Sequence, residues 1–164
     1  PRSTLFPYTT LFRSPYKPLP GAQKYDCVGL YGTVCLNPVP DWRHKLRASW
    51  TSPWGLDLSI TWRYVESVDL DKTDSNPALA GPVEATDKTL GSQSYIDLTG
   101  SYTFNDLGIF RSLTGRLGVN NVTDKDPPLI GLSNCLPPYC NGNTYSQLYE
   151  TLGRYIFVGL TADF

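Results

Sequence analysis

The last ten residues of the chain, Tyr155 to Phe164, alternate between apolar and other side chains over the length of a whole strand. Side chains of an extended strand point to opposite faces in turn. One face therefore carries only apolar residues: Ile156, Val158, Leu160, Ala162 and Phe164. Such a strand is long enough to cross a bilayer when tilted. The pattern predicts a membrane-spanning strand that ends on an aromatic residue, where a soluble chain end usually frays.

The composition agrees with a membrane protein without requiring one. The net charge is −1, so bulk charge indicates neither nucleic acid nor an anionic membrane surface as a partner. Aromatic residues make up 13% of the chain, which suits a boundary between apolar and wet regions but also a soluble β-rich domain. No apolar run is long enough for a transmembrane helix. The mean hydropathy of −0.26 is typical of soluble proteins, but alternating barrel strands average out in the same way.

Period-two alternation marks about five segments as strands. Their ranges are about 41–50, 54–65, 94–104, 112–122 and 153–164. In the clearest of them, Leu56, Leu58, Ile60, Trp62 and Tyr64 alternate with polar residues. Short turns with Pro or Gly join the first strand to the second and the third to the fourth. The sequence therefore predicts an all-β fold, an antiparallel up-and-down meander of about five strands.

Long loops are predicted between the other strands. Residues 15–40, rich in Pro and Gly, predict a loop outside the core, and the polar, acidic residues 66–92 predict a structureless stretch. Residues 123–151 predict another long loop. Short turns and long loops then alternate, as in a transmembrane β-barrel with short periplasmic turns. This parity puts both short turns and the C-terminus on one side, and all cysteines on the other. A soluble β-sandwich is the alternative, but strands of about ten residues with aromatic ends favour the last part of a barrel.

The four cysteines form two close pairs, Cys27 with Cys35 and Cys135 with Cys140. Close pairs in loop-like sequence favour disulfides and an oxidising compartment over free thiols. Zinc is not indicated, because His44 is the only histidine and no CxxC spacing occurs. We expect neither a metal nor another cofactor.

Residues 1–14 are expected to be foreign to the native protein. The stretch from Thr4 to Ser14, TLFPYTTLFRS, resembles the translation of a common sequencing-library adapter over its whole length. Such a segment is kept out of fold reasoning. The alternative is an ordinary disordered N-terminus. On the adapter interpretation, residues 15–164 are the C-terminal portion of a longer gene product.

Three stretches resemble the C-terminal end of a TonB-dependent outer-membrane receptor. They are Asn37–Arg47, Gly118–Pro128, and Tyr149–Tyr155 with the terminal strand. The motifs GVNNxxDKxPP and LGRYxFxGLxxxF are the most specific of these, and the resemblance covers residues from about 24 to 164. The paired loop cysteines are similar to those of one subgroup of this family.

The resemblance implies the last five strands of a plugged 22-stranded barrel in the outer membrane of a Gram-negative bacterium. It implies TonB-energised uptake of a scarce nutrient: siderophore-bound iron, cobalamin, haem or a glycan. The plug domain and the TonB contact belong to the missing N-terminal part. The other implied partners are outer-membrane lipid, which faces the apolar side chains of the terminal strand, and the barrel-assembly machinery, which reads Gly159 to Phe164. The family prefers a polar residue at Phe157 and a bulkier apolar one at Ala162.

Five strands cannot close a barrel, and lipid does not tolerate open strand edges. The chain alone is therefore expected to aggregate, and neither to transport nor to insert stably into a membrane. The alternative function is a soluble β-sandwich or a ligand-binding module of an exported protein.

No residue pattern predicts an enzyme. The pair Asp57 and Asp97 suggests acid–base chemistry only weakly, since both are expected to be solvated charges in a wet interior. Asp69, Asp71 and Asp74 lack the spacing of a calcium loop and are expected to be solvated loop charges. His44 has no recognisable nucleophile partner.

Aromatic residues of the last loop are the candidate ligand contacts. Tyr139, Tyr145 and Tyr149 are the residues concerned. They are placed to grip a sugar or a metal chelate, or equally to brace the loop.

Overall fold

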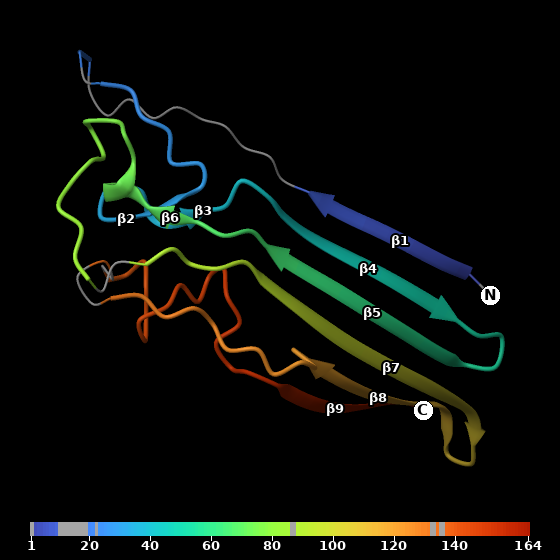
Figure 1. Cartoon of the computed structure of the whole chain (residues 1–164). Helices are drawn as coiled ribbons and strands as arrows, with labels where there is room; N and C mark the ends of the chain where they lie inside the picture. The colour runs from blue at the N-terminus through green and yellow to red at the C-terminus, as the bar shows by residue number, and fades with distance from the viewer. Residues whose placement is uncertain (1, 10–19, 22, 86–87, 132–133, 135–136) are drawn as a thin grey trace.

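The computed structural model describes residues 2–9, 20–21, 23–85, 88–131, 134 and 137–164. They form a six-stranded sheet in the order β1-β4-β5-β7-β8-β9 and a three-stranded sheet in the order β3-β2-β6 (Figure 1). The strands are β1 (Arg2–Thr9), β2 (Leu30–Gly32), β3 (Leu36–Val39), β4 (Arg43–Thr51), β5 (Leu56–Val65), β6 (Asp69–Leu70), β7 (Gln93–Leu107), β8 (Phe110–Asn120) and β9 (Tyr155–Asp163). A short 3₁₀ helix, η1, covers Asp71–Thr73.

The large sheet confirms the predicted all-β, antiparallel meander. The five predicted strands are present as β4, β5, β7, β8 and β9, and each is hydrogen-bonded to the next in chain order. The sheet order ends at β1 and β9. These two edge strands are not paired with each other, so the described strands form an open sheet.

Strand ends differ from the predicted ones where the backbone turns left-handed. Asn121 has φ 49° and Gly153 has φ 67°, so β8 stops at Asn120 and β9 starts at Tyr155. The ladder between β7 and β8 instead runs on to the pair Leu107 and Phe110, beyond the predicted turn at Asn105. Residues 105–107, which were expected in the turn, thus belong to β7.

The N-terminal segment forms a strand, although the sequence was expected to contribute nothing to the fold. Residues Arg2–Thr9 pair antiparallel with β4, from Arg2 opposite Thr51 to Thr9 opposite His44. An edge strand presents a row of unpaired N–H and C=O groups that accepts extended backbone with little regard to sequence. The pairing therefore says nothing of the segment's origin, and its adapter interpretation stays a prediction. Residues 1 and 10–14 lie outside the described residues.

The register puts all apolar alternate residues of the meander on one face. One row across five strands consists of Ala48, Ile60, Leu98, Val119 and Ile156. The next row consists of Trp50, Leu58, Gly100, Leu117 and Val158. A one-residue slip of any strand would break these rows, because it would turn that strand's side chains over.

Both short turns and the C-terminus lie at one end of the sheet, as the parity predicts. Asp163 is opposite Ser112, next to the β7–β8 turn, and Thr51 is opposite Asp57 at the β4–β5 turn. The three-stranded sheet lies at the other end with the long loops (Figure 1). We call these the turn end and the loop end.

Two predictions about the long loops were wrong. Residues 15–40 were expected to lie outside the core, but they form β2 and β3 and bury Leu30 and Tyr31. Residues 66–92 were expected to be structureless, but they form β6 and η1, with Val68 and Leu90 fully buried. The physical reason is that these two loops cover each other: β2 pairs parallel with β6. Residues 15–19, 22 and 86–87 lie outside the described residues.

Phe157 packs over a glycine on the polar face of the sheet. Gly118 is its direct partner across β8 and β9, and a Cβ added at Gly118 would lie 2.1 Å from the ring. An aromatic side chain that covers a cross-strand glycine shields its backbone from water. This contact accounts for an aromatic residue at a position where a polar one was expected.

Gly118→Ala is therefore expected to lower the free energy of unfolding by ~1–2 kcal/mol, because the ring must leave its place. Gly115→Ala is the matched control, since its added Cβ would meet only Leu160, at 3.9 Å. Urea midpoints in detergent micelles, followed by tryptophan fluorescence, measure both. The penalty at Gly118 is expected to vanish in a Phe157→Ala background; equal effects of the two glycine changes would contradict the contact.

Candidate functional site

The apolar face of the large sheet is exposed along every strand of the meander. Leu58, Leu98, Leu117 and Val158 are 46%, 42%, 55% and 74% exposed. Toward the chain end, Leu160 and Phe164 reach 75% and 85%. Soluble monomers rarely expose an apolar surface of this extent. The predicted lipid-facing residues Ile156, Val158, Leu160, Ala162 and Phe164 are all exposed, and Gly159 lies between them on the other face of β9.

Aromatic side chains gather at both ends of this face. At the loop end, the ring of His44 contacts those of Trp42, Trp62 and Tyr64, at centroid distances of 6.2, 4.5 and 5.4 Å. The indole N–H groups donate to polar partners: Trp42 to His44 Nδ1 and Trp62 to Ser94 Oγ. At the turn end, ring pairs form between Trp50 and Trp54, Tyr102 and Phe104, and Phe110 and Phe164. Apolar rings with satisfied polar tips suit a boundary between hydrocarbon and water.

The spacing between the two aromatic groups fits a bilayer. The ten-residue strand β5, Leu56–Val65, runs from one group to the other. At ~3.3 Å per residue this is ~33 Å, which a strand tilt of ~40° reduces to ~25 Å. The apolar band of outer-membrane barrels has a height of ~25 Å between its aromatic girdles.

The middle of the apolar face is hollowed. Gly100 and Gly115 lie on this face among Leu58, Leu98 and Leu117, and the space above them has a volume of ≈1070 Å³. The two glycines contribute no side chain to its floor. It is an open depression whose lining consists mainly of aliphatic side chains.

The opposite face is polar and is organised around Arg63. Its guanidinium donates from Nε and Nη2 to the carboxylate of Asp97, at 2.8 and 2.9 Å, and from Nη2 to Glu150, at 3.2 Å. Its Cζ also lies 5.1 Å from the centroid of the Tyr95 ring. A bidentate pair of this kind fixes geometry as well as charge. Arg63 thus ties β5 to β7 and to the loop that precedes β9.

Asp57 and Asp97 do not form a pair of catalytic carboxylates. In the register Asp57 is opposite Ser101, whereas Asp97 is opposite Thr61, four positions further along β5. The prediction that Asp97 is a solvated charge was wrong, because its carboxylate is bound by Arg63 and by the backbone N–H of Asn121. The side chain of Asp97 is only 14% exposed.

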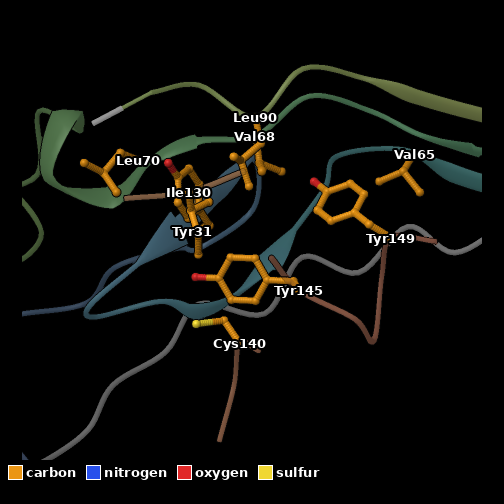
Figure 2. Packing of buried hydrophobic residues seen from close by; sticks show 9 residues of the cluster. All are labelled: Tyr31, Val65, Val68, Leu70, Leu90, Ile130, Cys140, Tyr145 and Tyr149. Atoms are coloured by element: carbon orange, nitrogen blue, oxygen red, sulfur yellow. The ribbon is translucent and has the colours of Figure 1, made fainter. Parts of the chain in front are cut away.

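The packed hydrophobic core lies among the loops at the loop end, away from the exposed apolar face (Figure 2). Its members come from four segments far apart in the chain: Tyr31, Val65, Val68, Leu70, Leu90, Ile130, Cys140, Tyr145 and Tyr149. The rings of Tyr31 and Tyr145 meet edge to face at 6.1 Å. A soluble β domain would bury its sheet face and leave its loops outside, which is the reverse of this distribution.

The candidate ligand contacts of the last loop are core residues. Tyr145 and Tyr149 are 1% and 3% exposed, and Tyr139 packs against the same cluster. Their position agrees with the alternative that they brace the loop. A ligand would reach Tyr145 or Tyr149 only after the loops had opened.

Burial raises the pKa of Tyr145 from 10.0 to about 12, and the nearby Tyr31 and Asp71 act in the same direction. The folded state then keeps this proton at a pH where the unfolded chain loses it. The stability from the neutral phenol is present below pH 10 and is lost as the pH rises through about 12. We expect the loop cluster to open in that window, with phenolate absorbance as the measurement. Tyr145→Phe should remove this step, and ionisation of Tyr145 near pH 10 would contradict its burial.

A buried carboxylate joins the first two loops. Asp71 is 0% exposed, and its Oδ2 accepts the backbone N–H groups of Val34 and Cys35, at 2.7 and 3.1 Å. Cys35 is bonded to Cys27, as predicted. Asp71 therefore holds the disulfide loop onto η1, and its expectation as a solvated loop charge was wrong. A Cβ at Gly32 would overlap this carboxylate, at 2.2 Å, so the glycine is required there.

The remaining described acidic residues of 66–92 and Cys140 belong to the loops at the loop end. Asp69 accepts from Thr89 and Asp74 accepts from the backbone of Asn76, so these carboxylates serve the loop itself. Within the described residues, no group of three potential ligands is arranged to hold a metal ion. Cys140 is disulfide-bonded and buried in the core cluster. Its predicted partner, Cys135, lies outside the described residues.

The two most specific sequence motifs meet at the start of β9. Asp124, in the first motif, accepts the backbone N–H of Arg154 at 2.8 Å and pairs with its guanidinium at 3.3 Å. Asn121 is fully buried, and its amide is hydrogen-bonded to the backbone of Lys125 at both ends. These contacts close the two ends of the β8–β9 loop onto each other. The motif residues are thus explained as a turn and its clamp.

Comparisons with protein-family models, curated proteins and solved structures find no match. Within the described residues, no helix is long and apolar enough to span a membrane.

Proposed function

We propose that the chain is the C-terminal part of an outer-membrane β-barrel, the last strands of a TonB-dependent receptor that takes up a scarce nutrient. The single observation that carries the membrane part is the inverted burial. The sheet exposes a continuous apolar face between two aromatic groups, while the packed core lies in the loops. The receptor part is supported by the motif resemblance of Gly118–Pro128 and Leu152–Phe164.

In this proposal the apolar face contacts lipid, the polar face lines the interior, and the turn end is periplasmic. The loop end, with the disulfide of Cys27 and Cys35, is extracellular. The protein partners are the plug domain, TonB and the barrel-assembly machinery. The chain meets them as part of the complete receptor. The role is binding and transport without catalysis.

Flotation with lipid vesicles tests the membrane part. The full chain is refolded from denaturant into vesicles or into plain buffer. We expect it to float with the vesicles, because lipid covers the apolar face, and to precipitate in plain buffer, where the strand edges and the apolar face stay uncovered. A soluble monomer at micromolar concentration that melts cooperatively would overturn the proposal. The receptor part is tested by sequencing the gene upstream of residue 15, where a plug domain is expected.

One observation favours a second candidate. The ≈1070 Å³ hollow over Gly100 and Gly115 would also suit an apolar ligand of a soluble, exported binding module. Such a module must stay monomeric in plain buffer and bind an apolar dye saturably at this face. The vesicle experiment distinguishes the two, because a soluble module does not float.

A further inference from the structure

His44 lies among aromatic rings at the loop end of the apolar face. Its imidazole stacks on the ring of Tyr64, with 23° between the two planes, and meets the ring of Trp62 edge to face. One of its nitrogens, Nδ1, accepts the indole N–H of Trp42 at 2.9 Å. The other nitrogen, Nε2, is buried and has no hydrogen-bond partner among the described residues. Within the described part of the chain, the bond to Trp42 is therefore the one hydrogen bond of the imidazole.

This bond fixes the protonation state of the imidazole. An indole N–H can only donate, so Nδ1 is the unprotonated nitrogen and the proton of the neutral ring lies on Nε2. Protonation of His44 adds a second N–H at Nδ1, which then faces the indole N–H of Trp42. Two donors cannot form a hydrogen bond with each other, so the bond is lost whichever ring moves. No second hydrogen bond to the described residues keeps the two rings together.

The groups around the imidazole leave its own charge as the one that controls this bond. Tyr64 is the titratable residue among the three rings in contact with it, and the residue opposite His44 on β1 is the uncharged Thr9. The nearby charged residues lie on the polar face or in the segments just outside the two strands. They are Arg43, Lys45 and Arg63 on the polar face, and Asp41 and Glu66 in the segments. Neither nitrogen of the imidazole is bonded to any of these residues.

Trp42 lies at a junction between the two sheets. It stands between the end of β3 at Val39 and the start of β4 at Arg43. Its carbonyl accepts the backbone N–H of Glu66 at 3.0 Å, where the chain leaves β5 for β6. Two connections between the large sheet and the three-stranded sheet therefore meet at Trp42. The bond from its indole to His44 fastens this junction to β4.

We propose that His44 is a pH-sensitive latch: its neutral imidazole holds the indole of Trp42 at this junction, and protonation releases it. The inference goes beyond the proposed function and depends only on the geometry of the two side chains. Histidine is the side chain whose charge ordinarily changes between pH ~5 and ~8. The loop end is therefore held to the sheet more firmly in neutral than in acidic surroundings.

NMR spectroscopy of the full chain in detergent micelles tests the latch through exchange of the indole N–H protons with water. Trp62 is the internal reference, because its indole N–H donates to Ser94 Oγ, an acceptor that does not titrate. We expect the exchange rate of the Trp42 indole, divided by that of Trp62, to rise ~5-fold when the pH falls from ~8 to ~5, because release removes one hydrogen bond. The nitrogen shifts of His44 at pH ~8 should place its proton on Nε2. An unchanged ratio, or a proton on Nδ1 in the neutral ring, would overturn the proposal.

Substitutions identify the titrating group. His44→Gln keeps a polar side chain that does not gain a proton in this range, and it should remove the pH dependence of the ratio. Tyr64→Phe and Asp41→Asn each remove another titratable group near the rings and should retain it. Persistence of the rise in His44→Gln, or its loss in Asp41→Asn, would assign the effect to another group and overturn the proposal. The ratio in the wild-type chain needs no substitution, so a variant that fails to fold leaves the first test intact.

Discussion

Leu117→Arg is expected to abolish stable association of the chain with lipid vesicles. Leu117 lies in the middle of the apolar face, 55% exposed, between Gly100 and Val158 in the register. An Arg on the lipid face of a barrel costs ~2–4 kcal/mol at the bilayer midplane. This corresponds to a ~30- to ~700-fold shift from the lipid-bound to the unbound state. The fraction that floats with vesicles in a density gradient measures it.

The neighbouring residue supplies the control. Arg116 is already a cation, one position away and on the other face, opposite Gly159. Arg116→Gln is expected to float like the wild-type chain. Exchanging the two residues, Arg116→Leu with Leu117→Arg, keeps the composition and should fail like the single change. For a soluble domain the same Leu117→Arg change is nearly neutral for stability and raises solubility, so an unaffected or more soluble variant contradicts the lipid face.

The strands were predictable because their signal is local. Each residue of β5 alternates with its neighbour, so Leu58 and Ser59 reveal their faces without knowledge of any other strand. Short turns with Pro or Gly then fix which strands are adjacent. The end of the sheet at which each turn or loop lies followed from the order of the strands alone, because successive strands run in opposite directions. Alternation could not show whether the apolar face meets lipid, a second sheet or a ligand, because all three need the same pattern.

The loops were mispredicted because their structure depends on distant partners. Tyr31 and Tyr145 are more than a hundred residues apart in the chain, yet their rings are in contact. Asp71 is buried only because it accepts the backbone of Val34 and Cys35, 37 and 36 residues earlier. Polar composition and Pro content indicate irregular backbone, but they carry no signal for which loops cover each other.

The polar face held the least predictable features. Alternation in β5 predicts that Arg63 lies on the polar face, but nothing near it in the sequence indicates its bond to Glu150, 87 residues later. The residues around it come from β4, β5, β7 and the last loop, which only the fold brings together. The position of Lys45 opposite Arg63 is likewise visible only in the register.

Asp97→Ala is expected to destabilise the chain by ~3 kcal/mol, through two separate losses. Its carboxylate receives two bonds from Arg63 and one from the backbone N–H of Asn121. Without it, Arg63 keeps its bond to Glu150 and its contact with the Tyr95 ring, and the backbone N–H of the fully buried Asn121 loses its acceptor. The ion pair is partly exposed, at 27% for Arg63 and 14% for Asp97, so solvent screening limits its share. Urea midpoints in micelles measure the total.

Two further variants separate these losses. Asp97→Asn keeps an acceptor for the Asn121 amide but removes the charge, so its effect should lie between those of wild type and Asp97→Ala. Asp163→Ala removes another carboxylate of the polar face, which accepts an exposed hydrogen bond from the Ser112 hydroxyl, and should cost less than ~1 kcal/mol. If Asp97→Ala lowered the free energy of unfolding no more than Asp163→Ala, the contacts of Asp97 with Arg63 and Asn121 would contribute no more than a surface hydrogen bond. If it is worse, Arg63→Leu should add little to it, because both changes release the same junction of β5, β7 and the last loop.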